Sequence, residues 1–324
     1  MKAQIRSIGI YLPERRMPNE AFAKFLDTSD EWITSNTGIK NRYIADDEQA
    51  ASDLGYEAAK QALAKAEISA LEVDLVLVAT ATPDYRGFPS TACIIQDRLG
   101  ATGAGAFDIS AACTGFVYAL ETARTYIVSN AAEKVLVIGT EIYSRVLDWT
   151  DRSTCVLFGD GAGAAFISNG SAERGILDSV LGSDGSRADV LKIPGGSRVS
   201  SEPMEANGEY YLTMRGRPVY NFAVRVITEV VSLLLERNKL TFDDLAYIVP
   251  HQANIRIIQS AARRLKIPVE KFFTNIADVA NTSAASIPLA LHDMVEDGRL
   301  KRDDLIVTVG FGGGLTYGGN LIRW

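Results

Sequence analysis

Residues 107–120, FDISAACTGFVYAL, join the end of an apolar strand to the start of an amphipathic helix. The strand-like run over 106–110 leads through two alanines to Cys113. Apolar residues then recur from Phe116 to Ile127 at intervals of four, three and four, so they share one helix face. A strand that runs directly into a helix is typical of α/β proteins, and this stretch predicts that class with a cysteine at the corner.

Cys113 lies where a helix begins, and this position affects its chemistry. Unpaired backbone N–H groups and the positive end of the helix dipole favour the thiolate over the thiol. A thiolate is the nucleophile with which proteins take up acyl groups. The alternative is a structural cysteine, because free cysteines are among the most commonly buried residues. Cys93 and Cys155 lie in apolar patterns that indicate burial, so we expect Cys113 to be the most reactive thiol.

The composition is that of an ordinary soluble globular protein, with 47% hydrophobic and 23% charged residues in a chain of 324. A net charge of −7 gives no support to nucleic acid or an anionic membrane as a partner. The start does not resemble a signal peptide, and apolar runs such as 230–235 are too short to cross a bilayer. Three widely spaced cysteines and two histidines, without metal-ligand spacing, predict a cytoplasmic protein without a metal site.

Helical and strand patterns alternate along the chain, and the second half repeats the order of the first. In the first half we expect strands at 4–11, 74–79 and 134–139, and helices at 52–65 and 91–99. An offset of 170 residues pairs Asp74-Leu75 with Asp244-Leu245, Asp108-Ile109 with Asp278-Val279, and Val135 with Leu305. Chance similarity between two α/β stretches is the alternative. Several elements in one register favour duplication, and we predict two pseudo-symmetric halves, 1–172 and 173–324.

The repeat brings further reactive groups to the same kind of corner. Under the offset Cys113 corresponds to Ser283, within ANTSAASIP. His251 follows directly on an apolar strand, and ligands of open α/β sheets bind beyond the carboxyl ends of strands. Alone, His251 could be a loop residue and Asn281 a helix cap. Cys113, His251 and Asn281 at three strand ends of one duplicated fold favour a shared active site.

These motifs resemble a known family. Cys113 in DISAACTGF, His251 in VPHQANIRI and Asn281 in NTSAASIP are similar to the catalytic triad of β-ketoacyl-acyl carrier protein synthase III, a condensing enzyme of the thiolase superfamily. The similarity runs from TSDEWI near the start, through FGDGAGAA, to GFGGGLTYG near the end, and so covers almost the whole chain. It implies a five-layered αβαβα fold of two similar halves.

The resemblance assigns roles by position. Cys113 is expected to carry the acyl group, while His251 and Asn281 bind the thioester carbonyl of the second substrate and stabilise its enolate. Both side chains can donate hydrogen bonds to developing negative charge. The backbone N–H groups of Cys113 and Gly313 are expected to form the oxyanion hole. Two aromatic residues are expected at the acyl group, Phe311 shielding the thiol and Phe88 closing the pocket.

For coenzyme A, the resemblance implies a substrate site and no separate cofactor. The expected contacts are Thr28, Trp32, Arg152, Gly216 and Asn254. Trp32 can stack on adenine, and Arg152 can neutralise phosphates. The chain departs from the family pattern at Asn36, where members carry an arginine, and at Ala280, where glycine commonly precedes the asparagine.

A second partner is implied for the helix after His251. Its residues Arg256, Arg263 and Arg264 share one face by their spacing. Such charges are usually only a solvated surface. In the resembled family this helix docks the acidic acyl carrier protein, and the enzymes are homodimers, so we expect both features here.

We therefore expect a cytoplasmic acyltransferase that condenses an acyl group, acetyl in the first instance, from coenzyme A with malonyl-acyl carrier protein. A degradative thiolase is disfavoured because GFGGG lacks the second cysteine of thiolases. The main alternative is a related condensing enzyme that uses another starter unit for secondary metabolism. A cysteine acyl hydrolase and a non-catalytic carrier-binding module are the remaining ones.

Overall fold

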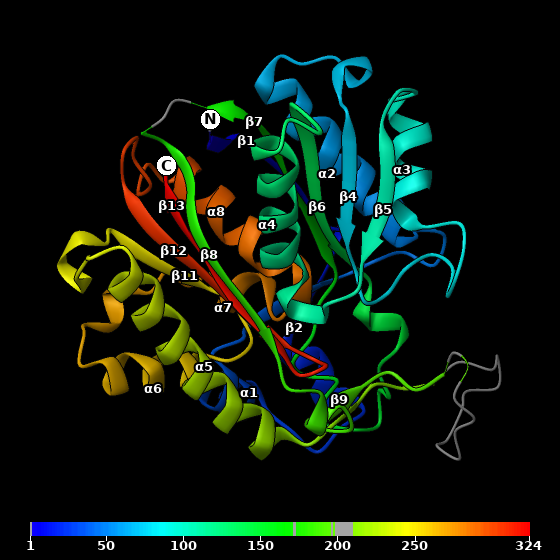
Figure 1. The fold of residues 1–324 in the computed structure, drawn as a ribbon. Helices are drawn as coiled ribbons and strands as arrows, with labels where there is room; N and C mark the ends of the chain where they lie inside the picture. The colour runs from blue at the N-terminus through cyan, green and yellow to red at the C-terminus, as the bar shows by residue number, and fades with distance from the viewer. Residues whose placement is uncertain (1, 171–172, 196, 198–209) are drawn as a thin grey trace.

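The first half of the chain forms a five-stranded sheet in the computed structural model, which describes residues 2–170, 173–195, 197 and 210–324 (Figure 1). The strands are β1 (Lys2–Tyr11), β4 (Leu75–Ala79), β5 (Gly105–Ile109), β6 (Lys134–Glu141) and β7 (Gly161–Gly170). They pair in the order β1-β7-β6-β4-β5, with β4 parallel to both β5 and β6. The apolar runs of β4 and β6 are buried on both faces, as expected for strands covered by helices on each side.

The second half forms a smaller sheet with the same central order. Its strands are β8 (Gly175–Ser183), β11 (Tyr247–Pro250), β12 (Leu305–Gly312) and β13 (Thr316–Arg323), paired as β11-β12-β13-β8. β12 is parallel to β11 and antiparallel to β13, as β6 is to β4 and β7. The repeat also predicted a strand around Asp278, but this segment is the short helix α7 (Ile276–Val279). The described part of this sheet therefore has four strands.

Helices complete five layers. α4 (Gly115–Val128) and α8 (Ser286–Glu296) pack between the two sheets in one continuous core, which contains residues from both halves. α2 (Ala51–Ala66) and α3 (Thr91–Leu99) cover the outer face of the first sheet. α5 (Gly216–Arg237) and α6 (Ile255–Leu265) cover the outer face of the second. The layers follow the order αβαβα, which confirms the predicted fold class (Figure 1).

α5 is the one helix among the described residues that is long and apolar enough to cross a membrane by length and composition. Its apolar side chains, among them Phe222, Val226 and Leu234, are buried against β11, β12 and β13. The amphipathic pattern of α5 is therefore that of a core helix in a soluble protein.

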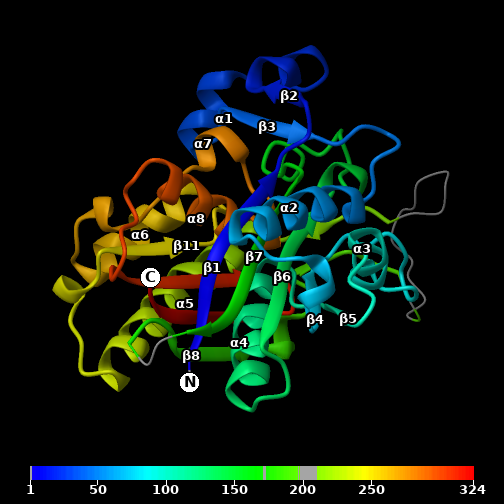
Figure 2. The same cartoon turned by 90° about the horizontal axis from the view of Figure 1, so that it is seen from above.

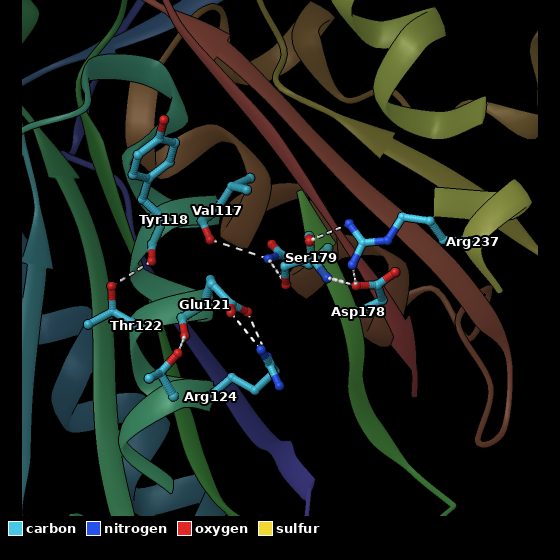
Figure 3. A network of polar contacts seen from close by, with 10 residues as sticks. Val117, Tyr118, Glu121, Thr122, Arg124, Asp178, Ser179 and Arg237 are labelled. Carbon is cyan, nitrogen blue, oxygen red and sulfur yellow. Dashed lines mark hydrogen bonds and ion pairs between the residues drawn. The ribbon is translucent and has the colours of Figure 1, made fainter. Parts of the chain in front are cut away.

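Polar contacts join the two halves beside the central helix α4 (Figure 3). Asn320 on β13 donates hydrogen bonds to the backbone carbonyl of Val117 and to the hydroxyl of Ser179, at 3.3 and 3.0 Å. Arg237 at the end of α5 pairs with Asp178 on β8 at 2.7 Å. The bond to Val117 links the helix that follows Cys113 to the sheet of the other half, and the other two contacts lie within that half.

The smaller elements gather at the end of the molecule toward which β4 and β5 point, where α1, β2 and β9 are labelled in Figure 1. They are α1 (Asp30–Thr37), β2 (Arg15–Pro18) paired with β3 (Asn41–Ile44), and β9 (Leu191–Lys192) paired with β10 (Thr213–Met214). Figure 2 shows α1, β2 and β3 together at one edge of the view from above. The hydroxyl of Ser29 accepts a hydrogen bond from the backbone N–H of Trp32 and so caps the start of α1.

Candidate functional site

A cavity of about 580 Å³ lies between the two halves and contains the three predicted catalytic side chains. Its buried end, here called the floor, is formed by Cys113, Tyr143, Phe158, His251, Asn281 and Phe311. Its open end, here called the mouth, is formed by Trp32, Asn36, Arg152, Gly216, Arg217 and Asn254. Residues far apart in the sequence thus meet where the strands of both sheets end, as the repeat predicted.

The two strand-to-helix corners have matching backbones. Each begins with one turn of 3₁₀ helix, η3 (Ala112–Thr114) before α4 and η8 (Ser283–Ala285) before α8. The first residue of each turn has a positive φ, 45° at Ala112 and 48° at Ser283. The structural offset is therefore 171 residues and not 170. The counterpart of Cys113 is Ala284, so the predicted pairing of Cys113 with Ser283 is wrong by one position.

Cys113 is buried at the floor, and burial raises the pKa of its thiol to about 12. Hydrogen bonds from the hydroxyls of Ser283 and Tyr143 act in the opposite direction but do not outweigh the loss of solvent. The expectation of a thiolate favoured by the helix end is therefore wrong for the free protein. Cys93 was expected to be buried, but it is exposed on α3, whereas Cys155 is buried as predicted.

A buried acid lies behind the nucleophile and was missed by sequence reasoning. The carboxylate of Glu141, the last residue of β6, accepts hydrogen bonds from the hydroxyls of Ser283 at 2.9 Å and Thr82 at 2.7 Å. Tyr143 in turn donates to the hydroxyl of Ser283 at 3.2 Å. Burial raises the pKa of Glu141 to about 7. The available signal was an acidic residue at the end of an otherwise apolar strand.

His251 is also buried at the floor. Burial lowers the pKa of its imidazole to about 3, so the ring is neutral at physiological pH. Its Nδ1 lies 2.7 Å from the hydroxyl of Ser286, which is also placed to donate to the backbone carbonyl of Ser283 at 2.8 Å. The hydroxyl has one proton and can donate it to only one of these two acceptors at a time. When this hydroxyl donates to Nδ1, Nε2 carries the ring proton. Phe311 packs edge-on against the ring, with 5.1 Å between centroids.

The side chain of Asn281 is oriented by the backbone of the 3₁₀ turn that follows it. Its side-chain oxygen accepts a hydrogen bond from the backbone N–H of Ser283 at 2.9 Å, which leaves the amide N–H groups for the cavity. Its backbone pairs with Leu157 and Gly159 in the other half. The preceding Ala280 has φ 57° and ψ −157°, a conformation that favours glycine. Ala280, which stands where the family commonly has glycine, therefore has a strained backbone.

The mouth presents an aromatic face and several cations. The guanidinium of Arg152 lies 4.6 Å from the centroid of the exposed Trp32 ring. Asn254 caps α6 and also donates to the backbone carbonyl of Asn36 at 3.1 Å. Arg217 and Arg256 line the same opening, although Arg217 was not predicted and Arg256 was assigned to docking alone. Although Asn36 replaces the arginine of the family pattern, the described lining of the mouth has three cationic side chains, Arg152, Arg217 and Arg256.

Several predicted residues do not line this cavity. Phe88 has 91% of its side-chain surface exposed in the loop before α3, so it does not close the acyl pocket of its own chain. Thr28 lies outside the lining, next to Asp27, whose carbonyl accepts a hydrogen bond from Arg152. Gly313 also lies outside it, with Ala112 as a neighbour. Arg263 and Arg264 are exposed on α6 beyond the mouth.

The arrangement offers a nucleophile, two neutral hydrogen-bonding side chains and a basic entrance. Such a cavity can take up an acyl group and stabilise negative charge on a second bound carbonyl. Within the described ranges, no cluster of three or more His, Cys, Asp and Glu residues could hold a metal ion.

Comparisons with known proteins give consistent results. Residues 107–185 match the family model described as 3-Oxoacyl-[acyl-carrier-protein (ACP)] synthase III, and residues 235–324 match its C-terminal model. Beta-ketoacyl-[acyl-carrier-protein] synthase III of Clostridium perfringens (strain 13 / Type A) is 49% identical over 324 residues, 99% of each chain. The crystal structure of 3-oxoacyl-[acyl-carrier-protein] synthase III from Aquifex aeolicus VF5 has a TM-score of 0.92 at 46% identity and covers 99% of this chain and 100% of its own. The synthase from Pseudomonas aeruginosa PAO1 has a TM-score of 0.93 at 43% identity, with 100% and 98% covered.

Full-length similarity at this level defines a thiolase-like condensing enzyme, an acyltransferase, as the five layers had indicated. More narrowly, the chain belongs to the β-ketoacyl-[acyl-carrier-protein] synthase III family.

Proposed function

We propose that the protein transfers an acyl group from coenzyme A to Cys113 and condenses it with malonyl-acyl carrier protein. Carbon dioxide leaves and a 3-ketoacyl product is formed, which begins fatty acid synthesis. The observation that carries this proposal is the convergence of Cys113, His251 and Asn281 on one cavity with a basic mouth. Coenzyme A is a substrate in this reaction, and no separate cofactor takes part.

In the first step the sulfur of Cys113 attacks the thioester carbonyl, and coenzyme A leaves as its thiol with the proton from Cys113. The neutral thiol must lose this proton as it attacks, and the hydroxyls of Ser283 and Tyr143 stabilise the sulfur as it becomes negative. We assign the oxyanion hole to the backbone N–H groups of Cys113 and Gly313. Gly313 neighbours Ala112, and at the preceding Gly312 a Cβ would collide with the backbone N of Cys113, so glycine there permits the close approach of this segment to the nucleophile.

In the second step malonyl-acyl carrier protein loses carbon dioxide, and its carbanion attacks the acyl carbon on Cys113. The electrons first collect on the thioester oxygen of the malonyl group, where His251 and Asn281 donate hydrogen bonds. A neutral His251 can donate from Nε2 when the Ser286 hydroxyl donates to Nδ1. Collapse onto the acyl carbonyl forms the new carbon–carbon bond and releases the sulfur of Cys113.

The partners follow from the same proposal. The mouth takes the nucleotide of coenzyme A, with Trp32 beside adenine and Arg152 beside phosphate. The basic face of α6 docks the acyl carrier protein. We further propose a cytoplasmic location and a homodimer. In the described part of the chain, β5 is an edge strand of its sheet, and the exposed Phe88 lies in the loop before α3, the helix that packs against β5.

The two half-reactions provide the test. His251→Ala and Asn281→Ala should each lose decarboxylation and condensation by about 100- to 1,000-fold, the typical cost of one preorganised donor. Both should still form the acyl-enzyme on Cys113, measured by intact mass, while carbon dioxide release is followed in parallel. His292→Ala is the matched control, because the other histidine lies on α8 beside Lys65 and away from the cavity.

The outcomes separate the alternatives. Loss of acyl-enzyme with normal decarboxylation would mean that His251 and Asn281 serve the nucleophile. Release of free acid without a condensation product would identify a hydrolase. Carrier protein binding with no acyl-enzyme on the wild-type protein would identify a binding module.

A further inference from the structure

In the reaction as described, only the hydroxyl of Tyr143 has a role, and its aromatic ring at the cavity floor has none. Tyr143 lies directly after β6, and its side chain is 3% exposed. The ring lines the same cavity as Cys113, and its hydroxyl is within hydrogen-bonding reach of the Cys113 thiol. A large aromatic ring therefore lies immediately beside the atom that receives the acyl group.

The ring is held in place on two sides. It stacks on Phe158 with 4.7 Å between centroids and 6° between planes. Its hydroxyl donates to Ser283, and Ser283 donates to the buried carboxylate of Glu141. Moving the ring aside would break the stacking and leave buried polar groups without partners, so the tyrosine acts as a rigid wall.

The wall and the sulfur lie together at the buried end of the cavity, away from the mouth. Coenzyme A is too polar for the floor, and its nucleotide belongs at the exposed mouth with Trp32 and Arg152. With its thioester at Cys113, the acyl chain then points away from the mouth and into the floor. There Tyr143 and its stacking partner Phe158 occupy the space that a longer chain would need.

We propose that Tyr143 determines the starter unit by closing the floor beyond Cys113, so that the enzyme takes a two-carbon acyl group and excludes longer or branched ones. This inference rests on the proposed function, because it assumes an acyl-enzyme on Cys113. Discrimination of about 10- to 200-fold for each methylene is typical of a packed apolar pocket. We expect acetyl to be preferred over butanoyl by at least about 100-fold for the two additional methylenes.

The experiment compares three proteins with three substrates. Wild type, Tyr143→Leu and Tyr143→Phe are each mixed with acetyl-, butanoyl- and 2-methylpropanoyl-coenzyme A, and acylation of Cys113 is followed by intact mass to give kcat/KM for each. Tyr143→Leu should raise the butanoyl-to-acetyl ratio by about 10-fold or more. Tyr143→Phe keeps the ring and should keep the wild-type ratio, even if loss of the hydroxyl slows acylation overall. Tyr118→Phe, which removes a tyrosine hydroxyl outside the cavity, is the control.

Each outcome decides the proposal. If the wild-type protein is acylated by butanoyl-coenzyme A as readily as by acetyl-coenzyme A, the proposal is refuted without any variant. The test therefore does not depend on whether Tyr143→Leu folds. If Tyr143→Phe raises the butanoyl-to-acetyl ratio as much as Tyr143→Leu does, the proposal is also refuted, because the hydroxyl and not the ring would then determine the choice of starter unit. If the wild-type protein prefers acetyl and Tyr143→Leu has the same butanoyl-to-acetyl ratio of kcat/KM, the role of Tyr143 is refuted but the proposed function is not. Absence of acylation in wild type would refute both.

Discussion

At the scale of single residues, burial makes both central groups of the cavity neutral. It raises the pKa of the Cys113 thiol to about 12 and lowers that of the His251 imidazole to about 3. The shifts are opposite because desolvation disfavours the anion in one case and the cation in the other. The nucleophile is therefore shielded from solution and positioned to react with a bound thioester.

This shielding leads to a prediction for thiol labelling. At pH 8, roughly one Cys113 thiol in ten thousand is ionised if its pKa is about 12. A limiting amount of iodoacetamide should therefore modify the exposed Cys93 before Cys113, as read by peptide mapping. Acetyl-coenzyme A should acylate only Cys113. Labelling of Cys113 ahead of Cys93 would show that its thiolate is stabilised more strongly than its burial allows.

Backbone strain gives a second prediction at this scale. Ala280 has a φ of 57° with an extended ψ, which costs an L-residue about 1–3 kcal/mol but glycine very little. Ala280→Gly should raise the free energy of unfolding by about 1 kcal/mol, measured by urea denaturation. The control is Ala290→Gly in the middle of α8, which should lower it by about 1 kcal/mol or more. Destabilisation of both variants to the same extent would mean that Ala280 is not strained.

At the scale of elements, α6 serves two surfaces. Arg256 in its first turn lines the mouth and donates to the backbone carbonyl of Ser35 at 3.1 Å. Arg263 and Arg264 in its last turn are exposed beyond the mouth. One helix can therefore contact coenzyme A at its start and the carrier protein at its end, so the three arginines are not equivalent.

We expect substitutions at the two ends of α6 to affect different half-reactions. Arg263→Glu with Arg264→Glu should raise the KM for malonyl-acyl carrier protein about 10-fold or more at low salt, with little change in acylation by acetyl-coenzyme A. Exposed charges act over about 10 Å at 0.1 M salt, which limits the effect to the docked partner. Arg256→Glu should weaken both half-reactions because it lies at the mouth. Lys60→Glu on α2 controls for the change of charge, and equal effects of all variants would contradict the division.

At the scale of the whole molecule, Glu141 joins the halves through a buried carboxylate. Its oxygens accept hydrogen bonds from Thr82 and the backbone of Ala81 in the first half and from Ser283 in the second. Burial still raises its pKa from 4.5 to about 7, so the folded protein holds a proton there that the unfolded chain releases. Where the folded state binds more protons, stability falls as the pH rises.

The pH dependence of stability follows from this shift. The stabilising contribution of protonated Glu141 is complete below pH 4.5 and is lost as the pH rises through about 7. The loss amounts to about 3 kcal/mol at 1.36 kcal/mol per pKa unit. Glu141→Gln cannot ionise, and its free energy of unfolding should lack this decline when both proteins are unfolded in urea between pH 4.5 and 7.5. If the free energy of unfolding changes with pH in the same way in both proteins, the decline does not come from Glu141.

The sequence by itself determined the elements and part of the site. The spacing of apolar residues predicted α2, α3, β4 and β6, since side-chain periodicity is a local property of the backbone. The positions of Cys113 and His251 just after apolar strands predicted that both lie at carboxyl ends of strands, where ligands bind. Asn281 follows the helix α7 instead of a strand, and β5 and β11 belong to different sheets, so the meeting of all three residues depended on the tertiary structure. The acidic residue at the end of β6 was equally visible but had no predicted partner.

Only the tertiary structure decided burial and therefore acid–base chemistry. Cys93 and Cys113 both lie in apolar sequence, yet Cys93 is exposed and Cys113 is buried. Tyr143 meets Ser283 across 140 residues of chain, and that contact depends on how two sheets pack around α4 and α8. A pKa depends on solvent exclusion by residues distant in sequence, and the room beside a thiol depends on side chains from both halves. Neither can be obtained from a pattern along the chain.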